Sequence, residues 1–576
     1  MTKSIPKIVC GAFTIYLSLV ILIGYYLDYF GISLTAGRII LPLLVISICY
    51  IGFTFISMHK HTLLSYEFDK TYTIIFFIIL TVAFIYFLLP SLPSFLPLGS
   101  NVDAPQAYAI TKLIADGHSL LWHGHIYSEY HPFWNVYPFG FHLNVAVLSW
   151  ISNIPPIKLI YPFMCLIIAM SVAGVYGIIV ESKITENKYL ATIPSFLLVT
   201  FVLLNLQMRL GGPFPRLFGA FLVIMFVWFL IDYVNKPSLL SLIPLILVEC
   251  AVIHSYTTFS MIPIAIFTFA LIFIIDQKKI KITHFILFTS IVIILSLSYL
   301  IIFYNATTYL VQAGIVDVIK QPDTLRIQIM PFNPWLSDEP IYVNLANMIA
   351  TVFFVVSIPG FLMHFTNKKA REIILFYGVT ALQILTFLAL VLIVNMRLML
   401  INNTLYVLMY PAAIAIFLGI KKCFNIENVS KKFSAIAFIC MILLTFATAP
   451  VMSFGCSTGL TGREAGITQN EYDTALWVKN NIGEDVVVVA DPGAQFFFFI
   501  ASEQKNITLI YSSYKHLDKE FKKWKAQAKS GDIVVVLNIY KVGSTINLHQ
   551  NNTVSIDGSA YEILYHKGVC YVLKYI

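Results

Sequence analysis

Charged residues are scarce in this sequence. Of its 576 residues only 11% are charged, while 59% are hydrophobic and the mean hydropathy is +0.82. Soluble domains carry roughly 25% charged residues, so a soluble globular protein is excluded and hydrocarbon is the expected solvent. The net charge of +8 does not indicate a nucleic-acid partner, because the basic residues fall in short segments between apolar runs.

Paired cysteines are also lacking. The eight cysteines include no CxxC pair, so neither a zinc site nor a disulfide framework is indicated. Only Cys456 and Cys570 lie outside the hydrophobic bulk on the predicted oxidising side, and the sequence leaves open whether they form a bridge. The first apolar run, 8–30, is too long for a signal-peptide core and has no small-residue cleavage site, so it is predicted to be a retained span.

Long apolar runs dominate the chain instead. A run of about 17 to 25 residues crosses a bilayer as a helix, whose backbone satisfies its own hydrogen bonds. About thirteen are predicted: 8–30, 39–58, 72–90, 158–180, 190–208, 217–233, 238–253, 256–275, 283–303, 344–364, 372–394, 403–420 and 433–452. Segment 453–576 is polar and alternates helical and strand patterns. The predicted fold is a polytopic α-helical membrane protein with a C-terminal soluble α/β domain.

The distribution of lysine and arginine predicts the orientation. With the N-terminus inside, the inner loops hold seventeen basic residues, whereas the outer loops, about twice as long in total, hold eight. This predicts a multi-pass cell-membrane protein with a cytoplasmic N-terminus and its C-terminal domain outside. Tyr137 to Ile151 is also apolar, but counting it as a span would reverse the bias. It is predicted to be an interfacial or re-entrant helix, with a short true span as the alternative.

The outer loop 91–157 holds the densest group of polar residues in the membrane part. Its segments NVDAPQAYAITKLIADGHSLLW and YHPFWNVYPFGFH resemble the first outer loop of the GT-C superfamily of polyprenyl-phosphate-dependent membrane glycosyltransferases. That superfamily includes oligosaccharyltransferase catalytic subunits, protein O-mannosyltransferases and aminoarabinose transferases. NEYDTALWVKNNIGEDVVVVADPG and YEILYHKGVCYVLKY are similar to the soluble tails of archaeal and bacterial members. The matching loop positions are Asp103, Tyr108, Ile114, Gly117 and Tyr137-Pro138-Phe139-Gly140.

The resemblance implies a fold and an activity. It implies a GT-C-like transmembrane domain over 72–452, preceded by two additional helices in 1–71. The implied activity is an inverting glycosyltransferase that moves a sugar from a polyprenyl phosphate or pyrophosphate to an extracytoplasmic protein, lipid or glycan. Such a transfer needs a base near the anomeric carbon and positive charge at the leaving phosphate. The expected partners are the lipid-linked donor, the acceptor and membrane lipids, with no nucleic acid.

Asp103 is the family-matched candidate for the catalytic base or for a metal ligand. Its alternative role is a helix N-cap, because Asp is favoured there and Ala104-Pro105 suits a first helical turn. A divalent cation, Mg²⁺ or Mn²⁺, is a candidate cofactor. Many relatives carry a second acidic residue in the next outer loop, but MRLGGPFPRLFG has none, which puts a metal-dependent pyrophosphate donor in doubt.

Three arginines are candidates for binding the donor phosphate. Arg209 and Arg216 flank Gly-Gly-Pro at the membrane surface, where they could grip a phosphate bidentately. Anchoring in the lipid headgroups explains the same two residues equally well. Arg397 lies in an outer loop where family members often keep a basic residue for the lipid phosphate.

Glu249 and His254 are further candidates for substrate binding. They lie at the outer end of the span 238–253, and a carboxylate inside a bilayer is costly enough to suggest a function. The alternative is a Glu that pairs with a polar group of a neighbouring helix. Tyr137 and His142 of the loop complete the candidate substrate-binding set. The other loop histidines lack consistent ligand spacing, which favours ordinary interfacial histidines over a metal cluster.

Two other classes of function remain open. A transporter or flippase of lipid-linked glycans should show inverted repeats and broken spans near the midplane, and no convincing repeat is found. A non-catalytic membrane scaffold would bind a partner through its outer domain and could dispense with Asp103. The sequence does not identify the sugar, the lipid carrier or the acceptor.

Overall fold

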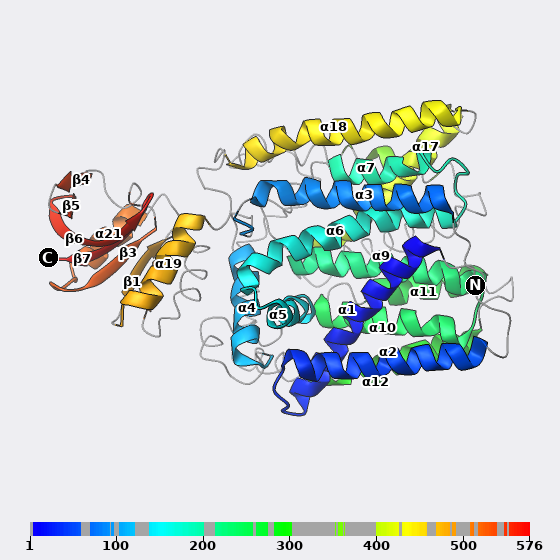
Figure 1. Ribbon diagram of the computed structural model, residues 1–576, viewed down its shortest axis with the longest axis horizontal. Helices are drawn as coiled ribbons and strands as arrows, with labels where there is room; N and C mark the ends of the chain where they lie inside the picture. Colours follow the sequence, from blue (N-terminus) through cyan, green and yellow to red (C-terminus); the bar gives the residue numbers. More distant parts are fainter. Residues whose placement is uncertain are drawn as a thin grey trace, which may run out of the picture.

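The computed structural model places a helical domain and a C-terminal α/β domain side by side along the long axis of the molecule (Figure 1). The N-terminus lies at the end of the helical domain opposite to the C-terminal domain. The residues that the structure describes are 4–58, 69–92, 94–96, 103–120, 138–200, 214–256, 261–274, 281–301, 352, 355–360, 362, 399–424, 429–457, 468–483, 486–490, 507–511, 517–537, 539, 546–549 and 552–576.

The helices of the membrane part follow the predicted apolar runs. They are α1 (Ile5–Tyr29), α2 (Ala36–Met58), α3 (Lys70–Leu88), α6 (Pro156–Glu181), α7 (Ile193–Thr200), α9 (Phe214–Asn235), α10 (Leu239–Ser255), α11 (Met261–Ile274), α12 (Ile282–Leu295), α17 (Met399–Phe424) and α18 (Lys431–Ser457). Among the described residues, five helices are long and apolar enough to cross a membrane. The predicted span 372–394 and most of 344–364 lie outside the described residues, so the count of thirteen stays a prediction.

Local sequence signals set the starts of these helices. Ser4 caps α1, whose first turn contains Pro6, and the Ser4 hydroxyl accepts the Lys7 amide N–H. Asp69 caps α3 in the same way, and its carboxylate accepts the Tyr72 amide N–H at 3.0 Å. Each helix then continues as an apolar stretch that satisfies its backbone internally, as hydrocarbon requires.

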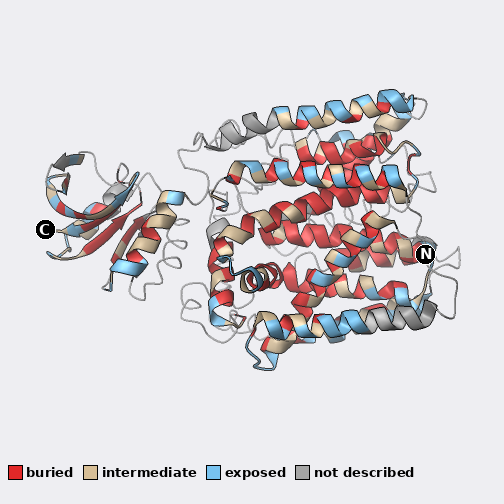
Figure 2. Cartoon of the chain, viewed as in Figure 1, coloured by how far each residue is buried: buried red, intermediate tan, exposed pale blue. Residues whose placement is uncertain are grey.

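Burial separates the centre of the helical domain from its rim. Figure 2 shows α6 and α9 buried along most of their length, whereas α2 and α18 present exposed faces. α6 packs against α3 and α9, and α10 packs against α9 and α1. The rim faces are apolar, and Leu41, Ile294 and Leu443 are among their exposed side chains. Apolar side chains exposed in this way face lipid, and the chain is a multi-pass membrane protein.

Contacts at the N-terminal end of the helical domain join predicted inner loops. Lys188, after α6, forms an ion pair with Asp69, before α3. Asn187 Nδ2 donates to Ser434 Oγ of α18 at 2.8 Å. All four residues lie on the predicted inner side.

Contacts at the other end join predicted outer segments and the C-terminal domain. The Leu34 N–H, before α2, donates to the His118 carbonyl at 2.6 Å. Lys158 Nζ donates to the Ser94 carbonyl at 3.1 Å and lies 6.0 Å from the Tyr472 ring centre of the C-terminal domain. The contacts agree with the predicted alternation of loops, and which end faces the cytoplasm stays a prediction.

Two outer-loop helices cross the direction of the long ones. α4 (Asp103–Gly117) runs along the end of the helical domain nearest the C-terminal domain, and α5 (Gly140–Ser152) is seen almost end-on (Figure 1). α5 has 13 residues, too few to span a bilayer, and its first eight are buried. The predicted interfacial helix over Tyr137 to Ile151 is therefore found at Gly140–Ser152 as a non-spanning helix.

The C-terminal domain contains a mixed sheet, and its described helices, α19 and α21, pack on opposite faces of that sheet. Its strands are β1 (Val486–Ala490), β2 (Ile507–Tyr511), β3 (Ile533–Val536), β4 (Ile546–His549), β5 (Thr553–Ile556), β6 (Ser559–Lys567) and β7 (Cys570–Tyr575), in the order β2-β1-β3-β7-β6-β5-β4. β1 is parallel to β2 and β3, and the other pairs are antiparallel. α19 (Gln469–Asn481) packs on β6 and β7, and α21 (Leu517–Lys525) packs on β1 and β2.

The sequence patterns of this domain predict helices at NEYDTALWVKNNI and SYKHLDKEFKKWKAQAKSG, strands at DVVVVADP and DIVVVLN, and a closing hairpin at YEILYHKGVCYVLKYI. The structure confirms them as α19, α21, β1, β3 and the hairpin of β6 and β7. That hairpin turns at Gly568, whose φ of 58° suits glycine. Strands β2, β4 and β5 were not predicted. Cys570 Sγ lies 3.1 Å from the Leu537 carbonyl oxygen. The Cys456 side chain lies outside the described residues, so a bridge between Cys456 and Cys570 is not tested.

Candidate active site

Helix α4, which begins at Asp103, is joined to α5 by a buried hydrogen bond. Thr111 Oγ1 donates its proton to the Ala107 carbonyl at 2.7 Å, and His142 Nδ1 lies 2.9 Å from the same Oγ1. Because the Thr111 proton is already engaged, His142 Nδ1 is the donor. Burial lowers the pKa of His142 to about 3. His142 is therefore a neutral residue that connects the two helices.

The far end of α4 is held by a second group of contacts. Trp150 Nε1 of α5 donates to the Ala115 carbonyl at 2.9 Å. The His118 ring stacks on Trp150 with centroids 5.4 Å apart, and its Nδ1 lies 2.7 Å from the Leu34 carbonyl. α4 and α5 form one rigid unit, which we call the outer platform.

Helix α1 also contacts the outer platform. The Asp28 carboxylate accepts the Leu120 N–H just after α4, at 2.8 Å. The Tyr25 hydroxyl accepts the Phe139 N–H, just before α5, at 2.6 Å and donates to the His254 carbonyl at 3.1 Å. α1 therefore shares one core with the platform and α10, and the proposed boundary at residue 72 stays a prediction.

Asp103 is the first residue of α4, and its side chain lies outside the described part of the structure. The position of its helix is nevertheless fixed through Thr111, through Ala115 and through the backbone at His118 and Leu120. Asp103 therefore lies in the first turn of α4 and not at the N-cap position before it. A carboxylate in a first turn interacts favourably with the positive end of the helix dipole.

Glu249 and His254 lie five residues apart on α10 and are both completely buried. His254 Nδ1 lies 2.6 Å from the Cys250 carbonyl, which can only accept, so the proton is on Nδ1 and Nε2 is left as an acceptor. Within the described residues, neither the Glu249 oxygens nor His254 Nε2 has a hydrogen-bond partner. Buried polar atoms of this kind are expected to bind a ligand, a water or a proton.

Arg216 lies in the first turn of α9 and is half-buried. This turn is packed on the platform, because the Phe214 ring lies 6.2 Å from Phe141 of α5 and 6.4 Å from Tyr161 of α6. The helix N-terminus adds partial positive charge to that of the guanidinium. Three other predicted site residues lie outside the described part of the chain: Arg209, Arg397 and Tyr137.

The described residues do not assemble a metal site. Among them, no three His, Cys, Asp or Glu side chains lie close enough to hold a metal ion. The described platform histidines, His118 and His142, both have hydrogen-bond partners at Nδ1.

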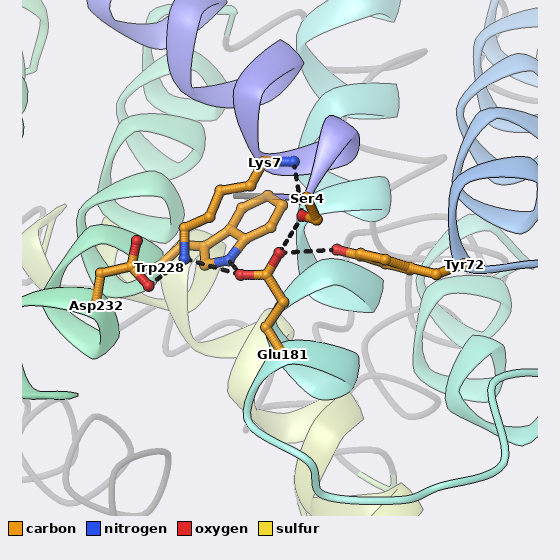
Figure 3. Close-up of polar contacts among 6 residues, drawn as sticks. All are labelled: Ser4, Lys7, Tyr72, Glu181, Trp228 and Asp232. Carbon is orange, nitrogen blue, oxygen red and sulfur yellow. Dashed lines mark hydrogen bonds and ion pairs between the residues drawn. The ribbon is translucent and has the colours of Figure 1, made fainter. Parts of the chain in front are cut away.

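A second polar cluster lies at the opposite end of the domain, and we call it the inner node (Figure 3). Glu181 of α6 is at its centre. Its Oε2 accepts from Lys7 Nζ at 2.8 Å and from Trp228 Nε1 at 2.8 Å. Its Oε1 accepts from the Tyr72 hydroxyl at 3.2 Å and from Ser4 Oγ.

The inner node ties four helices together. Lys7 also forms an ion pair with Asp232 of α9 and lies 5.4 Å from the Trp228 ring centre. Gly177 permits this packing, because a Cβ there would overlap the Trp228 indole. α1, α3, α6 and α9 thus meet at one saturated carboxylate, an arrangement that fixes helices rather than binding a substrate.

Sequence reasoning missed Tyr25, Asp28 and the inner node. The segment GYYLDYF did carry a signal, because its hydroxyls and carboxylate close an otherwise apolar run. Lys7 is one of the seventeen basic residues of the predicted inner loops, and the charge bias gives it no further role. Its pairing with Glu181 and Asp232 depends on contacts between positions more than 170 residues apart, which a local pattern does not show.

No family model matches the chain, and no curated protein matches it. An oligosaccharyltransferase from Archaeoglobus fulgidus, solved with Zn and sulfate, is 13% identical over 80% of this chain and 67% of its own, with a TM-score of 0.47. AglB from the same organism, solved with an inhibitory peptide and a dolichol-phosphate, is 13% identical over 85% and 74%, with a TM-score of 0.46.

ArnT from Cupriavidus metallidurans, solved with undecaprenyl phosphate, is 10% identical over 88% of this chain and 98% of its own, with a TM-score of 0.49. All three likenesses have TM-scores below 0.5.

Proposed function

We propose that the chain is a GT-C-type glycosyltransferase that takes a sugar from a polyprenyl-linked donor at the outer face of the membrane, with Asp103 as its base. The observation that carries the proposal is the outer platform. The helix that begins at the family-matched acid is held by buried hydrogen bonds from His142 of α5 and Asp28 of α1 and by a part-buried one from Trp150 of α5. A helix cap needs no such support, whereas a catalytic group must be held within about 0.5 Å of its productive geometry.

In the proposed reaction the acceptor hydroxyl or amide loses its proton to the Asp103 carboxylate. The acceptor atom forms a bond to the anomeric carbon as the bond from that carbon to the phosphate oxygen breaks. The phosphate leaves with the electron pair, and the single displacement inverts the anomeric centre. The developing negative charge on the phosphate needs a cation, for which Arg216, Arg209 and Arg397 are the candidates.

Glu249 and His254 are proposed to hold polar groups of the donor, together with Tyr137 and His142. Support comes from α10, where two completely buried side chains leave acceptor atoms without partners among the described residues. A carboxylate in such a place is costly unless a ligand group or a proton compensates it.

Replacing Asp103 by Asn tests the assignment. Asn caps a helix about as well as Asp, so the folded protein should be retained. A positioned general base contributes about 10²–10⁴-fold, and transfer should fall by that factor. The measurement is sugar transfer from a polyprenyl-linked donor in reconstituted membranes, with Tm determined on the same preparation.

Asp116 provides the matched control for this experiment. It lies on the same helix, is exposed and pairs with Lys112 one turn earlier. Asp116→Asn should therefore retain nearly full transfer. A stable Asp103→Asn protein that transfers at the wild-type rate would overturn the catalytic assignment and favour the transporter or scaffold alternatives.

A further inference from the structure

We infer that Tyr25 is a positioning residue for the proposed transfer. Its hydroxyl fixes the Phe139-Gly140 step through which the outer loop enters α5. The inference rests on the proposed function for its catalytic consequence, whereas its structural part can be measured without any assay of transfer.

Tyr25 is completely buried and uses both hydrogen-bonding capacities of its hydroxyl. The single proton goes to the His254 carbonyl at 3.1 Å, and the oxygen accepts the Phe139 N–H at 2.6 Å. The ring meets the His254 ring edge to face, with centroids 4.4 Å apart, and lies 5.9 Å from Tyr299. The hydroxyl therefore bridges the backbone of the outer loop to the backbone of α10.

The backbone approaches α10 very closely at the next residue. A Cβ at Gly140 would overlap Ser255 Oγ and lie 3.0 Å from the His254 carbonyl oxygen and 3.1 Å from Ile21 Cδ1. Only glycine fits this contact without displacing backbone. The start of α5 is thus held between α1 and α10, and Tyr25 supplies the hydrogen bond that holds it there.

A short chain of contacts leads from this step to Asp103. His142 lies two residues after Gly140 and donates to Thr111 of α4. Thr111 lies two helical turns from Asp103. Loss of the hydrogen bond from the Phe139 N–H to Tyr25 would let the start of α5 move. His142 would then shift, and with it α4, which carries the proposed base. A displacement of 1 Å at a reacting group can cost about 10²-fold in rate.

The chain offers a matched pair of variants. Tyr25→Phe keeps the ring contacts and removes only the hydroxyl. Tyr26→Phe removes a hydroxyl from the same helix, where Tyr26 donates to the Ile294 and Leu295 carbonyls of α12, away from the platform. Only the first variant should affect the step into α5.

Hydrogen exchange in detergent tests the structural part. Peptides that cover residues 138–142 should exchange about tenfold faster in Tyr25→Phe than in wild type, because the Phe139 amide loses its acceptor. Tyr26→Phe should exchange at the wild-type rate there. Unchanged exchange in Tyr25→Phe would overturn the inference, whatever the protein catalyses.

Transfer kinetics on the same preparations test the positioning role. Tyr25→Phe should lower kcat about 10- to 100-fold and leave KM for the lipid-linked donor nearly unchanged, while Tyr26→Phe keeps wild-type kcat. Faster exchange with wild-type kcat would show a purely structural Tyr25 and overturn the positioning role. If Asp103→Asn also retained full activity, the proposed function would fail independently of the exchange result.

Discussion

The two ends of the helical domain use buried polar groups in opposite ways. In the inner node, each oxygen of Glu181 accepts two hydrogen bonds from the described residues. At the outer end Glu249 is completely buried, and neither of its oxygens has a partner among the described residues. Both carboxylates lie on apolar helices, but only that of Glu181 has hydrogen-bond partners among the described residues.

This difference indicates which end has a task besides folding. A buried charge that is saturated by neighbours stabilises one arrangement of helices, and removing it should mainly reduce stability. Buried polar atoms without a hydrogen-bond partner lower the stability of the fold. A protein retains them where a bound ligand or a proton supplies the missing interaction. Substitutions at the two ends should therefore have opposite signatures in stability and activity.

The largest effect on stability is expected at the inner node. Glu181→Gln removes the negative charge opposite Lys7 and replaces one of the two accepting oxygens by an amide nitrogen that cannot accept. The free energy of unfolding should fall by about 2 kcal/mol, because a part-buried ion pair is lost and donors around residue 181 lose an acceptor. Thermal unfolding in detergent measures this. Exposed Glu186 is the control, since Glu186→Gln should change stability by less than about 0.5 kcal/mol.

A smaller, pH-dependent effect is expected at His142. Burial lowers its pKa from 6.5 to about 3, so between these values the unfolded chain binds a proton that the folded chain does not. His142 therefore costs stability as the pH falls below 6.5, with a slope approaching about 1.4 kcal/mol per pH unit. His142→Gln can still donate to Thr111 and should remove this slope. Equal slopes for variant and wild type, measured from about pH 7 to about pH 5, would contradict the assignment.

The smallest effect on stability is expected at Glu249. Glu249→Gln removes a buried acid that has no partner among the described residues, so Tm should stay within about 2 °C of wild type or rise. Donor binding should weaken about tenfold, because the carboxylate is proposed to hold a polar group of the donor. A large loss of Tm with unchanged binding would show that Glu249 is a structural residue like Glu181 and would remove the contrast between the two ends.

The helices could be predicted from the sequence, because each apolar run must satisfy its own backbone in hydrocarbon. The non-spanning helix α5 followed from charge balance, since Tyr137 to Ile151 could not be a span without reversing the distribution of lysine and arginine. β1 and β3 were recognisable as valine-rich runs. β2, β4 and β5 are edge or near-edge strands of four or five residues, too short for a clear alternation.

Candidate site residues could be proposed from the sequence only where a residue type is unusual in its surroundings. Glu249 and His254 are conspicuous in an apolar helix, and Asp103 matches a family motif. Tyr25 was not predictable, because its role depends on Phe139, a position 114 residues away, and a tyrosine in a membrane helix is common.

Mass spectrometry of extracytoplasmic glycans tests the central claim most directly. Cells that lack the gene should lose the mass of one sugar unit from a glycan, lipid or protein. Wild-type chain and Asp116→Asn should restore that mass, whereas Asp103→Asn, present in the membrane at the same level, should not. Identical glycan profiles with and without the gene, or full restoration by Asp103→Asn, would contradict the account.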